Sequence, residues 1–157
     1  MAVNTMGYQL LWDFGVPQVI TAQVNTAVAA VSGGQIAYLV SGTSAVVSSG
    51  LSSYVATDLQ VAAPASGINF PVGVITQNAV SGTYVGVLVR GCVILPASTD
   101  IVCGDPVCAT NGANAVDVIT SGTAAAQLAD VKQRVGRALT TAASGTSNYV
   151  LVHVGGI

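Results

Sequence analysis

The stretch Val72–Thr83, VGVITQNAVSGT, recurs 63 residues later as Val135–Thr146, VGRALTTAASGT, and this repetition decides the fold. Each copy runs into a Val-Leu-Val sequence, at Val87–Val89 and Val150–Val152, and nine of the eighteen positions from 72 to 89 match their counterparts. β-branched runs separated by a Ser-Gly-Thr turn are typical of two strands joined by a loop. A strand-turn-strand unit used twice indicates an all-β protein with an internal duplication.

Short β-branched runs punctuated by Gly, Ser, Asn and Pro continue along the rest of the chain. They predict strands at Val19–Val24, Gln35–Val40, Tyr54–Val61, Pro71–Thr76, Thr83–Arg90, Cys92–Leu95, Pro106–Ala109, Ala115–Thr120, Arg134–Thr140 and Tyr149–Val154. Asn111-Gly112 predicts a tight hairpin. Thr83–Arg90 is apolar on both faces, which predicts a strand buried between layers. Thr123–Gln133, rich in Ala, Gln and Leu, predicts the helix. We expect a compact β-barrel or β-sandwich over residues 19–157.

The composition predicts a protein that other subunits cover. Charged residues make up only 6% of the chain against about 25% in typical soluble domains, and apolar residues make up 52%. Either Ser, Thr, Asn and Gln solvate a monomer, or partners bury much of the surface. The mean hydropathy of +0.69 favours the second interpretation. The longest apolar stretches have five residues, against about 20 in a membrane-spanning helix. We therefore expect no membrane segment, and the N-terminus does not resemble a secretory signal.

Residues 1–18 differ in composition from the rest of the chain and are expected to form an extended N-terminal arm. Tyr8, Trp12 and Phe14 are three of the chain's eight aromatic residues, and they lie close to Leu11. Aromatic side chains are favoured anchors in interfaces. Two interpretations stay open at this point: an arm that docks on another subunit, or a first core strand.

The chain lacks the groups that catalysis needs. It has one histidine, no glutamate and six aspartates. Alternation places His153 on one strand face with Tyr149 and Leu151, and no nucleophile-elbow motif accompanies it. Asp100 and Asp105 lack the alternating carboxylates of a calcium loop, and no phosphate-binding loop is present. We expect no catalytic residue, no cofactor and no metal.

The three cysteines, Cys92, Cys103 and Cys108, are an odd number, which argues against a disulfide framework. A Cys103–Cys108 bridge across a turn is one interpretation. The favoured one is that the thiols are buried and act as small apolar side chains.

Three of the four basic residues, Lys132, Arg134 and Arg137, lie within six positions of one another. They either form a patch that meets an acidic neighbour or pair locally with Asp130 on a solvated loop. Nucleic-acid binding is not expected, because the net charge is −2 and the aromatic residues are not interleaved with the bases.

A set of short motifs resembles one particular family. The motifs, in order, are Phe70–Val74 (FPVGV), Val87–Pro96 (VLVRGCVILP), Gly104–Val107 (GDPV), Val135–Ala138 (VGRA) and the terminal valine-rich strand. Together, over residues 33 to 157, they resemble the small capsid decoration, or cement, proteins of tailed bacteriophages. Cys108 stands where that family often has an aromatic residue, the acidic residue common after its Ala-Gly turn is absent, and residues 1–18 have no counterpart.

The resemblance implies a compact β-barrel or β-sandwich on the outside of an assembled capsid, often as trimers, which clamps neighbouring major capsid subunits together. We therefore expect a non-enzymatic virion protein, made in the host cytoplasm, whose partners are the major capsid protein and further copies of itself. The residues expected at these interfaces are Tyr8, Leu11, Trp12, Phe14, Arg134 and Arg137.

Two alternatives remain open. One is a different virion subunit, such as a head fibre, a spike base or the shell-forming protein itself, which would assemble without a capsid. The other is a carbohydrate-binding β-module, which would bind glycans through exposed Tyr and Asn side chains. The scarcity of aromatic residues argues against the carbohydrate module.

Overall fold

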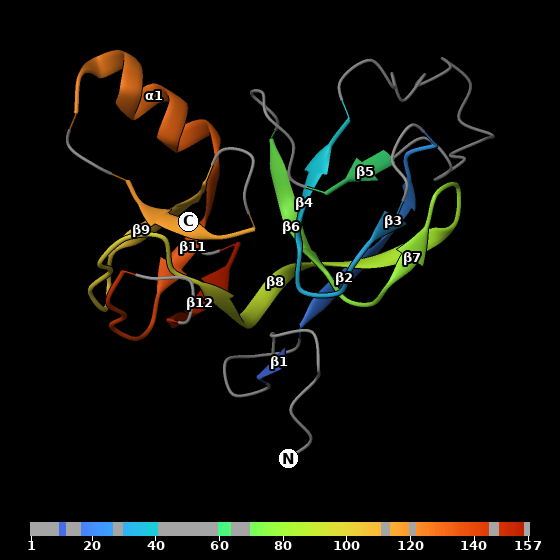
Figure 1. The fold of residues 1–157 in the computed structure, drawn as a ribbon, viewed down its shortest axis with the longest axis horizontal. Helices are drawn as coiled ribbons and strands as arrows, with labels where there is room; N and C mark the ends of the chain where they lie inside the picture. The colour runs from blue at the N-terminus through green and yellow to red at the C-terminus, as the bar shows by residue number, and fades with distance from the viewer. Residues whose placement is uncertain are drawn as a thin grey trace.

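In a computed structural model the chain forms two small β-barrels that share one long strand (Figure 1). The structure describes residues 10–11, 17–26, 30–40, 60–63, 70–110, 114–119, 122–144 and 148–155. The elements, in chain order, are β1 Leu10–Leu11, β2 Gln18–Val24, β3 Ala30–Val31, β4 Ile36–Leu39, β5 Gln60–Ala62, β6 Pro71–Ile75, β7 Ala79–Val80, β8 Tyr84–Pro96, β9 Pro106–Ala109, β10 Val116–Val118, α1 Ala124–Lys132, β11 Arg134–Ala138 and β12 Tyr149–Val154. The expected all-β barrel is confirmed.

The first barrel lies on the right of Figure 1 and is closed by five strands. Its order is β8-β2-β5-β4-β6, and β6 returns to β8 through Val74 and Leu88. β2 pairs antiparallel with β8 and parallel with β5. Its interior is filled by small and β-branched side chains: Ala22, Val24, Val31, Ala37, Val61, Ile75, Val85 and Val87. Burial of these apolar groups is the main force that holds the barrel closed.

The second barrel, on the left of Figure 1, starts where the first one ends. The C-terminal half of β8 pairs with β12, followed by β11, β9 and β10. A parallel bridge between Ala97 and Val116 connects the end of β8 to β10 and closes the ring. The helix α1 is inserted between β10 and β11. The interior positions are Val93, Leu95, Ala97, Ile101, Val107, Val116, Ala138, Val150 and Val152.

The two barrels share one hydrogen-bond pattern, so the duplication covers whole barrels. In the first, Asn25 N–H donates to the Val61 carbonyl at 2.9 Å and links β2 to β5. In the second, Ser98 N–H donates to the Val116 carbonyl at 2.9 Å and links β8 to β10.

The turns that lead into β4 and β9 are also equivalent. The side chain of Gln35 accepts a bond from Ser32 N–H at 2.7 Å, and the carboxylate of Asp105 accepts one from Val102 N–H at 2.9 Å. Each turn therefore uses the side chain three residues further on to satisfy the same backbone donor.

The strand registers correct the repeat alignment by two residues. β2 pairs Ala22 with Val85, and the second half of β8 pairs Leu95 with Val150. Val85 therefore corresponds to Val150, 65 residues later, and Tyr84 to Tyr149. The second copy has two more residues before its last strand, and the Val-Leu-Val match is not a structural equivalence. An insertion of two keeps every side chain on its original face, which explains why the fold tolerates it.

Glycines at Gly73 and Gly136 mark the best preserved part of the repeat. Each follows a bulged valine, because the pairing skips Val72 in β6 and Val135 in β11. A Cβ at Gly73 would overlap the carbonyl oxygen of Leu88, and a Cβ at Gly136 would overlap the same atom of His153. The bulge and the close strand approach therefore require glycine in both barrels.

The strand β8 is continuous, although the sequence predicts two separate strands, one on each side of Gly91. Gly91 adopts φ +139°, a conformation open to glycine, and lets the strand bend between the barrels. Val85 and Val87 face the first interior, whereas Leu88 belongs to the cluster of the second barrel. The predicted burial of both faces is confirmed.

The barrels are joined by an apolar contact beside the shared strand. Ile36, Tyr38, Val74 and Leu88 point out of the first barrel and belong to the core cluster of the second. Asn114, between β9 and β10, clamps this contact: its side chain accepts a bond from Ile36 N–H at 2.9 Å and donates to the Gly34 carbonyl at 3.2 Å. The two barrels therefore share one core across their boundary.

The local predictions are confirmed where the structure describes them. β9 and β10 form an antiparallel hairpin, although Asn111-Gly112 itself lies outside the described residues. The predicted helix is α1, and Thr123 caps it, because its Oγ1 accepts a bond from Ala126 N–H at 3.5 Å. The strand predicted over Tyr54–Val61 is described only from Gln60, where β5 begins.

Candidate interaction surface

Most of the predicted N-terminal contact residues fall outside the described part of the chain. Tyr8, Trp12 and Phe14 lie there, so the arm over residues 1–18 stays a prediction. Leu11 lies in β1, where it is the backbone partner of Cys92 in β8. β2 begins at Gln18, the last residue of the predicted arm.

The two predicted arginines play different parts. Arg134 starts β11, is half-buried and lines a pocket between the barrels. Arg137 is exposed, and its Nη1 donates to the Gly104 carbonyl at 2.9 Å, which holds the turn before β9. Arg137 thus has a structural role that the sequence did not indicate.

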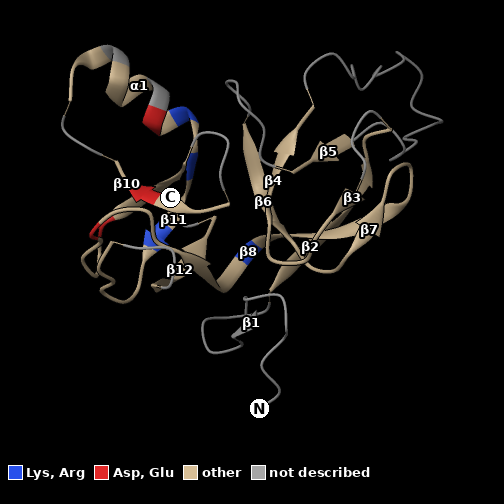
Figure 2. Cartoon of the chain, in the orientation of Figure 1, with Lys and Arg blue, Asp and Glu red and all other residues tan. Residues whose placement is uncertain are grey.

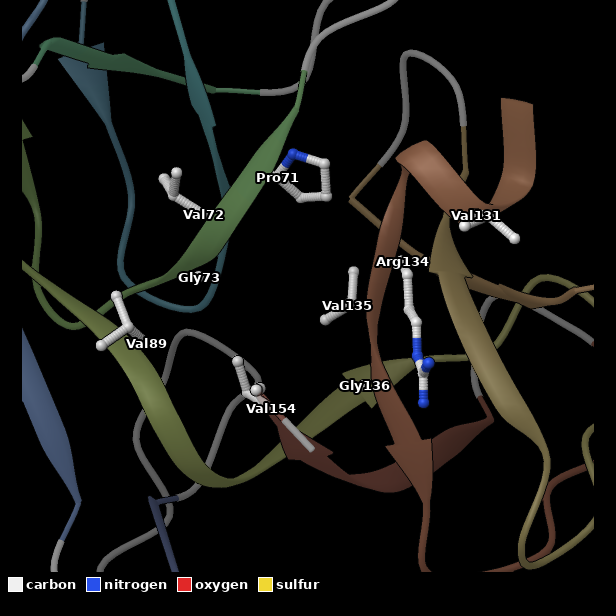
Figure 3. A pocket seen from close by; sticks show the side chains of 10 residues that line it. Pro71, Val72, Gly73, Val89, Val131, Arg134, Val135, Gly136 and Val154 are labelled. Atoms are coloured by element: carbon white, nitrogen blue, oxygen red, sulfur yellow. The ribbon is translucent and has the colours of Figure 1, made fainter. Parts of the chain in front are cut away.

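The pocket between the barrels has a volume of about 440 Å³ (Figure 3). Its lining comprises Pro71, Val72, Gly73, Val89, Val131, Arg134, Val135, Gly136, Val154 and Gly155. Eight of these residues form four pairs that occupy matching positions in the two copies of the repeat. Residues 71 to 73 match residues 134 to 136, and Val89 matches Val154. In Figure 3, Pro71 of β6 and Val135 of β11 lie on opposite sides of the pocket. The pocket therefore sits where the two copies of the repeat face each other.

The chemistry of this pocket is apolar. Arg134 is the single ionisable side chain among the described residues that line it. The side chains of valine, proline and glycine are apolar, so the pocket suits an apolar group. The sequence signal that could have located it is the repeated Val-Gly pair, which by itself predicts only a strand.

Charge is distributed unevenly between the barrels (Figure 2). Apart from Arg90 of β8, the described charged residues all belong to the second barrel, its turns and α1: Asp100, Asp105, Asp117, Asp130, Lys132, Arg134 and Arg137. The described surface of the first barrel is solvated by neutral side chains. Gln23, Asn25 and Gln60 form an amide ladder there, with bonds of 2.7 and 3.5 Å.

Large apolar side chains are exposed on the first barrel. Val19 of β2 is 52% exposed and Tyr84 of β8 is 49% exposed. Val19, Thr21, Gln23 and Tyr84 lie on one side of the β2–β8 ladder, and we call them the neutral face. A surface with few charges and an exposed tyrosine is suited to protein contacts, because little must be desolvated.

The prediction that the three cysteines are buried thiols is correct for two of them. Cys92 and Cys108 are buried, but Cys103 is exposed, and all three are thiols, so the Cys103–Cys108 bridge is wrong. Cys103 lies in an exposed turn, where its thiol donates to the Leu139 carbonyl. Burial raises the pKa of the Cys108 thiol to about 12, and Asp130 and Asp117 add to the shift. A thiol with so high a pKa is not a nucleophile at neutral pH.

Tyr38 occupies the position in β4 that Cys108 occupies in β9. Its side chain is 3% exposed, and its hydroxyl has no hydrogen-bond partner within the described part of the chain. Burial raises the pKa of Tyr38 to about 12, and the nearby Cys108 adds to the shift. The contact between the barrels therefore contains two groups that resist ionisation.

His153 follows the expected alternation, since Tyr149, Leu151 and His153 alternate with buried valines along β12. Among the described residues, no three His, Cys, Asp or Glu side chains gather as a metal site. Over the same residues, no helix is long and apolar enough to span a membrane.

No family model and no curated protein matches the chain. The class is therefore defined by the fold, a pair of small β-barrels that share a strand. One solved structure with this fold is the N-terminal base of the head fibre protein gp8.5 of bacteriophage phi29. It matches with a TM-score of 0.50 and 17% identity, over 90% of this chain and 97% of the fibre base. The similarity establishes a shared fold.

Proposed function

We propose that the chain is a non-enzymatic structural protein of a bacteriophage head. It binds the outer surface of the assembled capsid and bridges neighbouring major capsid subunits. The observation that carries the proposal is the shared fold: 90% of the chain matches a protein whose name places it at the base of a fibre on a phage head. The motif resemblance to decoration proteins supports the same location.

The neutral face is the surface proposed to meet the capsid. Tyr84 and Val19 supply exposed apolar area, and Thr21 and Gln23 supply uncharged hydrogen-bonding groups. The N-terminal residues Tyr8, Leu11, Trp12 and Phe14 are proposed to extend the contact, and Arg134 and Arg137 to add polar contacts at its rim.

Binding to the shell, and not to its free subunits, would stabilise the shell by mass action. Buried apolar area contributes about 25 cal/mol per Å², of which the cost of association removes a large part. Because the neutral face carries no charge, the contact should change little with ionic strength.

The test is co-sedimentation of the purified protein with capsid shells of the phage that encodes it. We expect the protein to pellet with shells at both 50 mM and 500 mM salt and to remain in the supernatant without them. Replacing Trp12 with Ala should reduce shell occupancy about tenfold, the loss typical of an interface anchor, with an unchanged circular dichroism spectrum. A protein that stays in the supernatant beside intact shells would overturn the proposal.

A second candidate, the base of a head fibre, is favoured by the 97% coverage of the phi29 fibre base. A fibre base must bind two partners, the shell below and a fibre above. Electron microscopy of decorated shells separates the two functions. A cement protein leaves compact knobs on the shell, whereas a fibre base, mixed with the virion's other structural proteins, carries an elongated projection.

A further inference from the structure

One edge of β2 carries backbone groups that no described residue pairs. Asn25 N–H points toward β5, where it bonds to the Val61 carbonyl. The backbone groups of alternate residues in a strand point to the same edge, so those of Val19 and Thr21 face this side as well. β5 covers the edge only at Gln23 and Val24. Within the described part of the chain, Val19 and Thr21 have no strand beside them there.

The matching edge in the second barrel indicates what kind of segment such an edge binds. β2 corresponds to the second half of β8 with a shift of 73 residues, which matches Val19 and Ile20 with Cys92 and Val93. In the second barrel, β1 pairs antiparallel with these two residues of β8. β1 consists of two leucines. The preferred occupant is therefore a short, extended and apolar strand.

The described chain has two such edges but one such strand. β1 fills the edge of β8, whereas none of the described strands pairs with the matching edge of β2 at Val19 and Thr21. β2 has the sequence QVITAQV, with no charged residue or proline to prevent pairing. Val19, half-exposed beside the edge, offers apolar contact to a strand placed there.

We propose that the edge of β2 at Val19–Thr21 binds an extended, uncharged segment of the capsid subunit by strand addition. This inference rests on the proposed function and identifies how the partner is held. The added strand occupies the place on the first barrel that β1 occupies on the second. Backbone bonds provide the attachment, and the neutral face provides the side-chain contacts next to it.

Amide hydrogen exchange of the full-length protein, free and bound to shells, tests the proposal directly. In the free protein the amides of Val19 and Thr21 should exchange rapidly, whereas those of Ala22 and Val24, which face β8, should be protected. On shells, the exchange of the first two amides should slow by at least tenfold. The other two provide an internal control for the integrity of the barrel.

A pair of variants at one position gives an independent test. Thr21→Pro removes the outward N–H from an edge position, where proline is tolerated. Thr21→Val keeps the N–H but removes the hydroxyl, so the difference between the two variants isolates the backbone N–H. Shell affinity should fall at least tenfold further in Thr21→Pro than in Thr21→Val. Protection of the Ala22 and Val24 amides shows whether the proline variant is folded.

Three results would overturn the inference. If the protein binds shells while Val19 and Thr21 still exchange rapidly, strand addition is wrong and the proposed function stands. If the two amides become protected with rising protein concentration and no shells, the edge binds a second copy instead. If the protein does not bind shells at all, the proposed function fails together with the inference.

Discussion

The two barrels have the same backbone but different surfaces. Their closing hydrogen bonds, their turns and the bulges before Gly73 and Gly136 are equivalent. The first barrel carries a single described charge, Arg90 at the end of its part of β8, whereas the second carries the other described charges and α1 (Figure 2). The hydrogen-bond frame of a small barrel can therefore be kept while its outer side chains diverge.

The interiors differ in a complementary way. Ala22 in the first barrel corresponds to Leu95 in the second, and Ile75 corresponds to Ala138. A small residue in one position is offset by a large one in another, which keeps the packed volume nearly constant. Identity was lost inside the barrels because total volume matters more than the residue at each position.

The strongest test of the equivalence is to add a methyl group to each paired glycine. Gly73→Ala and Gly136→Ala should each lower the free energy of unfolding by about 3 kcal/mol or more, because the Cβ overlaps a backbone oxygen that side-chain motion cannot move. Urea denaturation followed by circular dichroism would measure both losses. Similar losses would confirm that the two positions make the same contact.

Gly86→Ala is the matched control. Its Cβ would approach only the hydroxyl of Thr76 and a methyl of Val19, which are side-chain atoms that can shift. The cost of displacing these side chains is offset in part by the preference of a strand for alanine over glycine, so the expected loss is about 1 kcal/mol or less. A loss at Gly86 equal to those at Gly73 and Gly136 would mean that the backbone overlap is not the cause.

A smaller effect, on binding, would sharpen the difference between the surfaces. Tyr84 and Tyr149 occupy equivalent positions and are 49% and 46% exposed. Tyr84→Ala should weaken binding to shells about tenfold, or about 1.4 kcal/mol. Tyr149→Ala should change it less than twofold, because Tyr149 is not among the residues proposed to contact the capsid. Equal losses in a sedimentation titration would contradict the proposal that Tyr84, and not Tyr149, contacts the shell.

The smallest effect concerns alkaline pH and the equivalent residues Cys108 and Tyr38. Between pH 9 and 12 the unfolded chain loses the Cys108 proton, while the folded protein keeps it because the pKa is raised to about 12. Stability should therefore be complete below pH 9 and fall as the pH rises toward 12. Cys108→Ala should flatten this decline in thermal melts, leaving the part above pH 10 that comes from Tyr38. An unchanged slope in the variant would rule out the thiol as a source.

Much of the fold was predictable because certain backbone conformations restrict which residues can occupy them. The Val-Gly pairs survive since both bulges need glycine, and α1 was visible because Ala, Gln and Leu favour helices. The match of β4 with β9 was not predictable, because Ile36-Ala37-Tyr38 and Pro106-Val107-Cys108 share no residue. Their equivalence is visible only from the strands with which they pair, because β4 pairs with β6 and β9 pairs with β11 in matching registers.

The candidate surface was less predictable than the fold. The sequence indicated aromatic anchors near Trp12 and a basic cluster, but Arg137 holds a turn and Arg134 lines a pocket. The neutral face depends on which strands pair, since Val19 and Tyr84 are far apart in the chain and come to share a face only through the β2–β8 ladder. Composition predicts a surface that partners cover, but strand pairing decides which residues share a face.

The shared strand β8 also determines the order in which the chain folds during synthesis. The first barrel can close once Arg90 has been made, because its five strands are then complete. Its outward residues Ile36, Val74 and Leu88, however, remain in water until the second barrel forms behind them. That barrel needs β12, whose last residue is Val154. A ribosome that has made the first barrel but not yet β12 therefore carries a closed barrel with one apolar side still exposed to water.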